Sequence, residues 1–302
     1  MIAQEIVKRA LACKTVIPAF NIPYLPMLEP VAQAIYDEDS LAMIQVARLE
    51  WEKFGAQSPE AVAKEYAKYN KQGYTLLHLD HVPAIDEDMQ RVDYLSILRR
   101  ALDAGYQSVM VDGSRLPLEE NIAVTARAAE LAHGYQAAVE AELGSVAGHE
   151  GSGIGLSYEE MFQSKKGFTK VEEARRFAKE SGCDWLSVAI GSFHGAIAAN
   201  TKHLRKPTAR LDIEQLTALA EATWHMPLVL HGGSGIDQTY ILQAIAHGIA
   251  KINVGTEIRQ PYEQAIEARP NDLAYAQDQV YARTRKVIHE FLHTTGNHKL
   301  WE

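Results

Sequence analysis

Short apolar segments with strand character alternate along the chain with longer segments of helical periodicity. The eight segments that predict strands are residues 17–22, 41–47, 75–81, 108–113, 137–144, 185–191, 227–233 and 251–256. Helical patterns lie between them at 28–39, 89–105, 118–134, 170–182, 212–223 and 237–248, and several close on a glycine that favours a left-handed C-cap. Eight strands with intervening helices predict an α/β fold, a (β/α)₈ barrel of the TIM type.

The apolar character of these strands favours a closed barrel over an open sheet. Segments such as VMVDG, LSVAIG and PLVLHGG are almost continuously hydrophobic, as expected of parallel strands buried on both faces. A doubly wound open sheet is the alternative, but no GxGxxG follows the first strand. No linker-like composition divides the 302 residues, so we expect a single domain, 1–302, with the barrel at about 15–260 and a helical extension at 261–302.

Two segments do not fit a minimal barrel. Residues 145–167 contain the glycine-rich stretch GHEGSGIG, which we interpret as a flexible loop and a candidate lid, with an ordinary mobile loop as the alternative. Residues 261–302 have helical character, and we expect them to pack against a neighbouring subunit or the barrel base.

Composition and charge exclude several classes of protein. No apolar stretch approaches the roughly 20 residues of a membrane span. The amino-terminal residues lack a signal-peptide pattern, and Cys13 and Cys183 cannot form a disulfide framework, so we expect a cytoplasmic protein. The net charge of −9 argues against nucleic-acid binding, and local groups must therefore hold any anionic substrate.

Side chains able to do chemistry gather at the carboxyl ends of the predicted strands, where barrel enzymes place their active sites. His81, His194 and His231 each lie where an apolar segment meets a turn, in HLDH, IGSFHG and LVLHGGSG. Each histidine alone is more simply a packed side chain, so the prediction rests on their joint position. Three imidazoles from separate strands are a ligand set for a catalytic zinc ion with an open fourth position. No lysine stands at these strand ends, since Lys251 is expected at the opposite end of its strand, so a metal-assisted route fits better than an imine route.

Six segments, in this order and spacing, resemble the class II, zinc-dependent ketose-phosphate aldolases, which include fructose- and tagatose-bisphosphate aldolases. They are HLDH, SVMVDGSRLPLEENI, VEAELG, AIGSFHG, PLVLHGGSGI and KINVGTEIR, and the resemblance extends over residues 18–259. It implies a barrel enzyme that reversibly cleaves a phosphorylated ketose, a small-molecule partner, to dihydroxyacetone phosphate and an aldehyde through a metal-stabilised enediolate. It also implies a homodimer or homotetramer.

The resemblance implies roles for individual residues. His81, His194 and His231 match the zinc ligands, and Asp112 and Glu142 match carboxylates of a second position for a divalent or monovalent cation. Asp80 matches the residue that removes the proton of the C4 hydroxyl, and Glu150 matches the carboxylate that exchanges a proton with the donor carbon. The matches for the dihydroxyacetone phosphate pocket are Asn21, Gly195, Gly232, Gly233, Ser234, Asn253, Gly255 and Thr256.

The four carboxylates also have purely structural alternatives. Asp80 is then an acceptor that orients a ligand imidazole, and Glu150 is a solvated loop residue. For Asp112 and Glu142 the alternative is support of the barrel mouth without metal contact.

Three positions depart from the fructose-bisphosphate pattern of this family. Ala47 replaces a common serine, Gly255 replaces aspartate or asparagine, and Ala198 replaces a lysine, for which Lys202 or Arg205 is available as a substitute. We therefore expect an acceptor aldehyde other than glyceraldehyde 3-phosphate, with Arg48, Arg115 or Arg259 available for another anionic or polar group. The alternatives are another zinc-dependent lyase or epimerase acting on a sugar acid or sugar phosphate, and a non-catalytic sugar-phosphate sensor.

Overall fold

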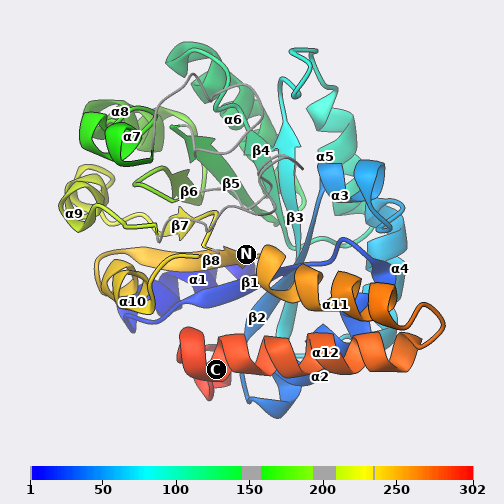
Figure 1. Cartoon of the computed structure of the whole chain (residues 1–302). Coiled ribbons are helices and arrows are strands. Elements are labelled where there is room, and N and C mark those ends of the chain that lie inside the picture. The colour runs from blue at the N-terminus through cyan, green and yellow to red at the C-terminus, as the bar shows by residue number, and fades with distance from the viewer. Residues whose placement is uncertain (1, 145–157, 193–208, 234, 302) are drawn as a thin grey trace.

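The eight predicted strands form a closed parallel barrel in sequence order, with β8 returning to pair with β1 (Figure 1). The computed structural model describes residues 2–144, 158–192, 209–233 and 235–301 of the chain. The strands are β1 Ile17–Asn21, β2 Ala42–Ala47, β3 Thr75–Pro83, β4 Ser108–Asp112, β5 Ala138–Leu143, β6 Trp185–Val188, β7 Leu228–Leu230 and β8 Ile249–Val254. The barrel predicted from the sequence is therefore confirmed.

Helices surround the barrel. They are α1 Ile2–Ala12, α2 Leu28–Asp37, α3 Arg48–Lys53, α4 Pro59–Tyr69, α5 Tyr94–Asp103, α6 Leu118–Gly134, α7 Tyr158–Ser164, α8 Val171–Glu180, α9 Ile213–Ala222, α10 Gln238–Ala246, α11 Thr256–Ala268 and α12 Leu273–Lys286. Short turns of other helical types are η1 Leu25–Met27, η3 Val287–Phe291 and η4 Asn297–Trp301. Within the described residues, no helix has the length and apolar composition of a membrane span.

Each of the six helical patterns produced a helix, and α12 lies in the extension that was expected to be helical, but α1, α3, α4 and α7 were not predicted. Helix α4 had a local signal, because Ser58 caps it by accepting from the N–H of Ala61 at 3.1 Å and Pro59 occupies its first turn. Helix α7 lies inside the segment 145–167 that we expected to be a flexible loop, so that expectation is wrong for residues 158–164. Residues 145–157 lie outside the described residues.

Helix α1 closes the amino-terminal end of the barrel. Its apolar positions Ala3, Ile6, Val7 and Ala10 recur at helical spacing and are all buried. They pack against inward-facing strand residues such as Met43, Leu76 and Trp185. The base of the barrel thus contains an apolar layer, and the described residues of the predicted site lie at the opposite end.

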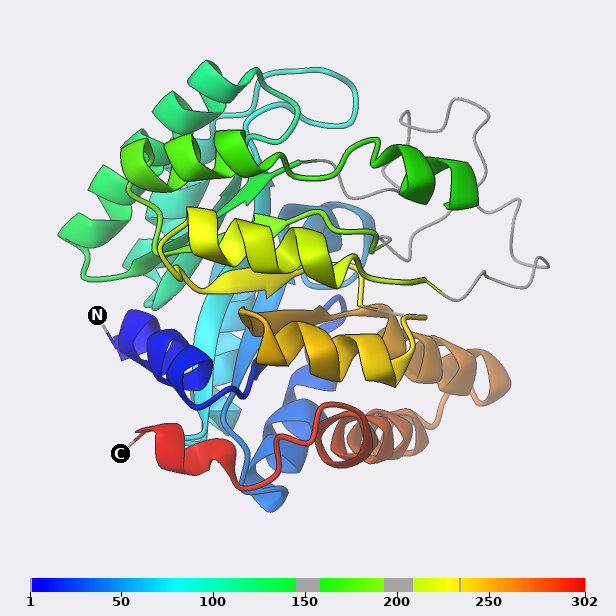
Figure 2. The ribbon, with the colours of Figure 1, turned by 90° about the vertical axis from the view of Figure 1, so that its left-hand side faces the viewer.

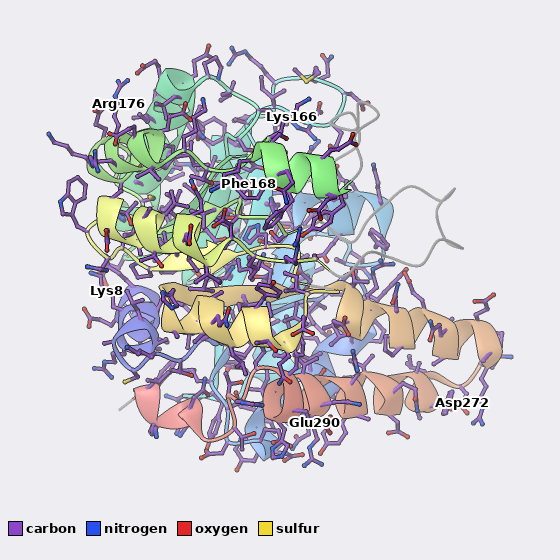
Figure 3. All side chains as sticks on the ribbon, turned by 60° about the vertical axis from the view of Figure 1, so that its left-hand side comes forward. Lys8, Lys166, Phe168, Arg176, Asp272 and Glu290 are labelled. Carbon is purple, nitrogen blue, oxygen red and sulfur yellow. The ribbon has the colours of Figure 1, made fainter. Side chains whose placement is uncertain are left out.

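The carboxyl-terminal helices pack on the side of the barrel next to α2 (Figure 1). Helix α11 follows β8 directly and continues through Pro261, so the expected barrel limit at about 260 falls inside this helix. Helix α12 is capped by Asp272, labelled in Figure 3, whose carboxylate accepts from the N–H of Tyr275 at 3.0 Å. The chain then returns to the base, where η4 lies beside α1 (Figure 2) and Arg9 donates to the carbonyl of Leu300 at 3.0 Å.

Asn297 holds this returning segment to the start of β2. Its buried Oδ1 accepts from the N–H of Leu41 and from the hydroxyl of Ser40, and its Nδ2 donates to the carbonyl of Val16 at 3.3 Å. Asn297→Ala leaves the buried N–H of Leu41 without its partner, so we expect the free energy of unfolding to fall by about 1–3 kcal/mol. Urea unfolding measures the change. The exposed neighbour Lys299→Ala is the control, and an equal loss in both variants would contradict this role.

Candidate active site

A cavity of about 200 Å³ opens at the carboxyl ends of the strands. Among its lining residues are Asn21, Glu50, Asp80, His81, Gly232, Gly233, Asn253, Gly255, Thr256 and Arg259. A larger hollow of about 790 Å³ lies near the barrel base, between α1 and residues such as Trp224, but it contains none of the predicted site residues. The candidate site is therefore the smaller cavity, at the end of the barrel that the sequence indicated.

An irregularity in β3 brings two successive residues to this cavity. Neighbouring residues of a regular strand face opposite sides of the sheet. Here the register between β3 and β4 shifts between Leu79 and Val82, and His81 has a φ of 32°, which residues other than glycine rarely adopt. This local strain allows both Asp80 and His81 to reach the site, and strained backbone is often found at functional sites.

Asp80 is fixed as an ionised carboxylate by amide groups. Nitrogen atoms of Asn21, Gln45 and Asn253 donate to its two oxygens at 3.0, 3.1 and 3.0 Å. Burial alone raises the pKa of Asp80, but the nearby charges of His81 and Lys251 outweigh it and hold the pKa below the ordinary value. At neutral pH Asp80 is therefore in the form that accepts a proton.

His81 and His231 come together from β3 and the end of β7. Their ring centroids are 4.6 Å apart, and the rings are inclined at 65°. Nδ1 of His81 lies 3.4 Å from Oδ2 of Asp112, and Nδ1 of His231 lies 3.3 Å from Oε2 of Glu142. Although burial lowers the pKa of His81, the charges of Asp80, Asp112 and Glu142 raise it to about 10. The surrounding carboxylates therefore favour a positive charge at this place.

These residues have the donor types and the spacing of a metal site. Potential ligand atoms of Asp80, His81 and His231 lie within 4.8 Å of one another, and so do those of His81, Asp112 and Glu142. Oε1 of Glu142 is buried and has no hydrogen-bond partner in the described part of the chain. Imidazole nitrogen and carboxylate oxygen are ligands that zinc accepts, so the residues fit a divalent cation. His194, the third expected ligand, lies outside the described residues.

The other predicted site residues lie at two neighbouring strand ends or outside the described part. Gly232, Gly233, Asn253, Gly255 and Thr256 line the cavity together with Asn21. Three of the predicted positions, Glu150, Gly195 and Ser234, fall outside the described residues, as does Ala198. Helix α11 begins at this wall, and the N–H groups and dipole of a helix start favour an anion.

Of the three candidate arginines, Arg259 alone lines the cavity. Its guanidinium is paired with Glu263 at 2.7 Å and lies 5.4 Å from the ring centroid of Phe54. Arg48 is paired with Glu52 on α3 at 2.9 Å. Arg115 lies in the turn after β4 and does not line the cavity.

Sequence reasoning missed a charged cluster inside the barrel, directly below the site. Nζ of Lys251 lies 2.9 Å from Oε2 of Glu140 and donates to Oδ1 of Asn253 at 2.6 Å. Glu140 also accepts from Nε1 of Trp185 at 2.6 Å, and its Oε1 lies 2.7 Å from Nε2 of His231. Burial raises the pKa of Glu140, but Lys251 and His231 hold it well below the ordinary value. The ionised Glu140 thus accepts the hydrogen of Nε2 and directs Nδ1 of His231 towards Glu142.

The expected position of Lys251 was wrong. Strand β8 begins at Ile249, two residues earlier than predicted, so Lys251 is an interior residue of the strand and is fully buried. The sequence did contain a signal for this cluster, because residues two positions apart in a strand lie on the same face of the sheet. Glu140 and Glu142 have this spacing in β5, and Lys251 and Asn253 have it in β8.

Comparison with known proteins points to one family. A model of class II fructose-bisphosphate aldolase matches residues 2–298. The D-tagatose-1,6-bisphosphate aldolase subunit GatY of Klebsiella oxytoca is 32% identical over 286 residues, which cover 93% of this chain and 92% of that protein. The crystal structure of the YdjI aldolase from Escherichia coli K12 is similar with a TM-score of 0.76 and 26% identity, covering 98% of both chains. Fructose-bisphosphate aldolase from Campylobacter jejuni shares the fold, with a TM-score of 0.73, 18% identity, and coverage of 98% and 95% of the respective chains.

The contact between Glu140 and His231 predicts an effect on metal affinity. Glu140→Gln removes the negative charge that orients the imidazole, so we expect zinc affinity to fall by about 10–100-fold, as for other partners of metal-binding histidines. Competition with a chromophoric chelator measures the affinity. The exposed Glu130→Gln on α6 is the control. Equal affinity in Glu140→Gln and the parent protein would show that Glu140 does not support the metal site.

Proposed function

Because the chain belongs to the class II fructose-bisphosphate aldolase family, we propose that it is a zinc-dependent aldolase that reversibly cleaves a phosphorylated ketose to dihydroxyacetone phosphate and an aldehyde. Aldolase activity, a carbon–carbon lyase reaction of carbohydrate metabolism, follows from membership of the family. The observation that carries the zinc proposal is the grouping of potential ligand atoms of Asp80, His81 and His231 within 4.8 Å at the barrel mouth.

The proposed zinc ligands are His81, His231 and, from the sequence, His194. When bound, zinc supplies a Lewis acid that polarises the carbonyl group of the substrate. The adjacent carboxylates Asp112 and Glu142 are proposed to hold a second divalent or a monovalent cation.

Asp80 is the proposed base for the C4 hydroxyl group. In cleavage, the hydroxyl proton moves to Asp80, the C4–O bond becomes a carbonyl, and the electron pair of the C3–C4 bond remains on C3. The donor carbon then takes a proton, for which Glu150 is the proposed source. The amides that donate to Asp80 keep its carboxylate in one orientation, and condensation runs the same transfers in reverse.

Two features support a donor pocket that binds a phosphate group. The neighbouring acceptor pocket is proposed to have no phosphate-binding group. Gly232, Gly233, Gly255 and Thr256 bring backbone N–H groups and a helix start to one wall, at the usual phosphate position of barrel enzymes. Among the described residues that line the cavity, the one arginine is Arg259, which is already paired with Glu263; Lys202 and Arg205 lie outside the described residues. We therefore propose an acceptor aldehyde other than glyceraldehyde 3-phosphate.

We also propose that the enzyme is a cytoplasmic homodimer or homotetramer, in line with the family resemblance and the composition. Light scattering coupled to size-exclusion chromatography would determine the subunit number.

The substrate and metal requirements can be tested together. The enzyme is incubated with ketose 1-phosphates and with fructose and tagatose 1,6-bisphosphates, and dihydroxyacetone phosphate is assayed as the product. We expect its release from at least one substrate, loss of activity on chelation and recovery with zinc. Unchanged turnover after complete chelation would refute zinc dependence, and a clear preference for fructose 1,6-bisphosphate would refute the proposed acceptor.

Asp80→Ala separates an aldolase from a sugar-phosphate sensor. Loss of the proton acceptor is expected to lower kcat by about 10²–10⁴-fold, while zinc remains bound because His81 and His231 are unchanged. Steady-state kinetics and metal analysis of the purified variant provide the two measurements. Full activity of a zinc-loaded Asp80→Ala enzyme would exclude Asp80 as the base.

A further inference from the structure

Glu50 has a carboxyl group that lines the cavity. It is neither a proposed metal ligand nor a participant in the proposed proton transfers. It is the third residue of α3, which begins immediately after β2. Its Oε2 accepts from the N–H of Ala47 at 2.8 Å and from Nδ2 of Asn21 at 3.3 Å. The carboxyl group thus folds back from the helix over the end of β2 and towards the site.

A single amide group joins Glu50 to the proposed base. Nδ2 of Asn21 donates to Oε2 of Glu50 and, at 3.0 Å, to Oδ2 of Asp80. The oxygen of the same amide accepts from Gln45 at 2.8 Å, so hydrogen bonds on both sides fix the orientation of Asn21. Glu50 is therefore held one amide away from the atom proposed to receive the C4 proton.

Helix capping does not by itself account for this arrangement. A carboxylate at the third helical position often accepts from the N-cap N–H, but this uses only one oxygen. Among the described residues, no partner hydrogen-bonds to Oε1 of Glu50 and no lysine or arginine pairs with the group. Glu52 of the same helix is 38% exposed and paired with Arg48, as a surface carboxylate usually is.

The electrostatic surroundings favour a hydrogen-bonding role over a charged one. Burial raises the pKa of Glu50, and the charge of Asp80 adds to this, so the pKa reaches about 8 although Ala47 and Asn21 donate to the group. A protonated carboxyl group can both donate to and accept from a sugar hydroxyl. Ala47, at the end of β2, has no polar side-chain group of its own, so Glu50 supplies the polar group at this place.

We propose that Glu50 is a specificity-determining residue of the acceptor half, where its carboxyl group binds the substrate hydroxyl on the carbon next to C4. The proposal rests on the proposed aldolase function. It predicts that the enzyme selects acceptor aldehydes with a hydroxyl group beside the aldehyde carbon. A pocket built to hydrogen-bond a hydroxyl rejects an analogue without it, because its polar group is then left unpaired.

Condensation with a matched pair of aldehydes tests the proposal. Glycolaldehyde and acetaldehyde differ by one hydroxyl group on the carbon in question, and each is offered with dihydroxyacetone phosphate to the zinc-loaded enzyme. We expect the parent enzyme to prefer glycolaldehyde in kcat/KM, and we expect Glu50→Ala to reduce this preference about tenfold or more. The KM for dihydroxyacetone phosphate should stay within about twofold, because Asn21 loses its contact with Glu50 but keeps its hydrogen bonds to Asp80 and Gln45.

Two further variants control for structural damage. Glu52→Ala, on the same helix, should keep the preference of the parent enzyme. The double variant Ala47→Ser with Glu50→Ala supplies a serine N-cap for α3 together with a hydroxyl group, and it should fold and regain part of the preference.

The possible outcomes separate this inference from the proposed function. An enzyme that joins dihydroxyacetone phosphate to neither aldehyde and cleaves no ketose phosphate would refute the aldolase proposal and the Glu50 proposal with it. An active enzyme whose Glu50→Ala variant keeps the parent preference would overturn the Glu50 proposal alone. A parallel rise in the KM values for dihydroxyacetone phosphate and for both aldehydes would also overturn it, by showing that Glu50 acts on the whole site.

Discussion

The active end of this barrel depends on the buried pair formed by Lys251 and Glu140. Both side chains are fully buried, so each charge compensates the burial of the other. From this pair, hydrogen bonds lead upwards in two directions, through Glu140 to His231 and through Asn253 to Asp80. One ion pair therefore orients both a proposed metal ligand and the proposed base, and the apolar layer under it, closed by α1, keeps water away from the pair.

The fold could be predicted from the sequence because its determinants are local. Parallel strands buried on both faces produce continuous apolar segments, and residues at their carboxyl ends necessarily meet at one end of a barrel. This geometry places Asp80, His81 and His231 at the carboxyl end of the barrel, but it does not by itself turn both Asp80 and His81 towards the cavity. The strand limits were less predictable, since β8 starts two residues earlier than the hydrophobic pattern indicated, and this shift changes Lys251 from a residue at the strand start to an interior one.

The position of Glu50 in the cavity could not be predicted because it depends on a change of chain direction. Glu50 reaches the cavity only because α3 begins at once after β2 and its side chain turns back to the N–H of Ala47. In the sequence it is one of two glutamates in RLEWEK, and no periodicity distinguishes it from Glu52. Likewise, the register shift in β3 that brings both Asp80 and His81 to the site comes from pairing with β4, not from the residues HLDH themselves.

The contact between Asn297 and Leu41 joins residues 256 positions apart in the chain. Together with the pairing of β1 and β8, it means that the first strands lack part of their final hydrogen bonding until nearly the whole chain is available. Contacts of such long sequence separation are formed late and slow the folding reaction. During synthesis β1 therefore exposes an unpaired edge until β8 is made, and this edge is where chaperone binding or misassembly would act.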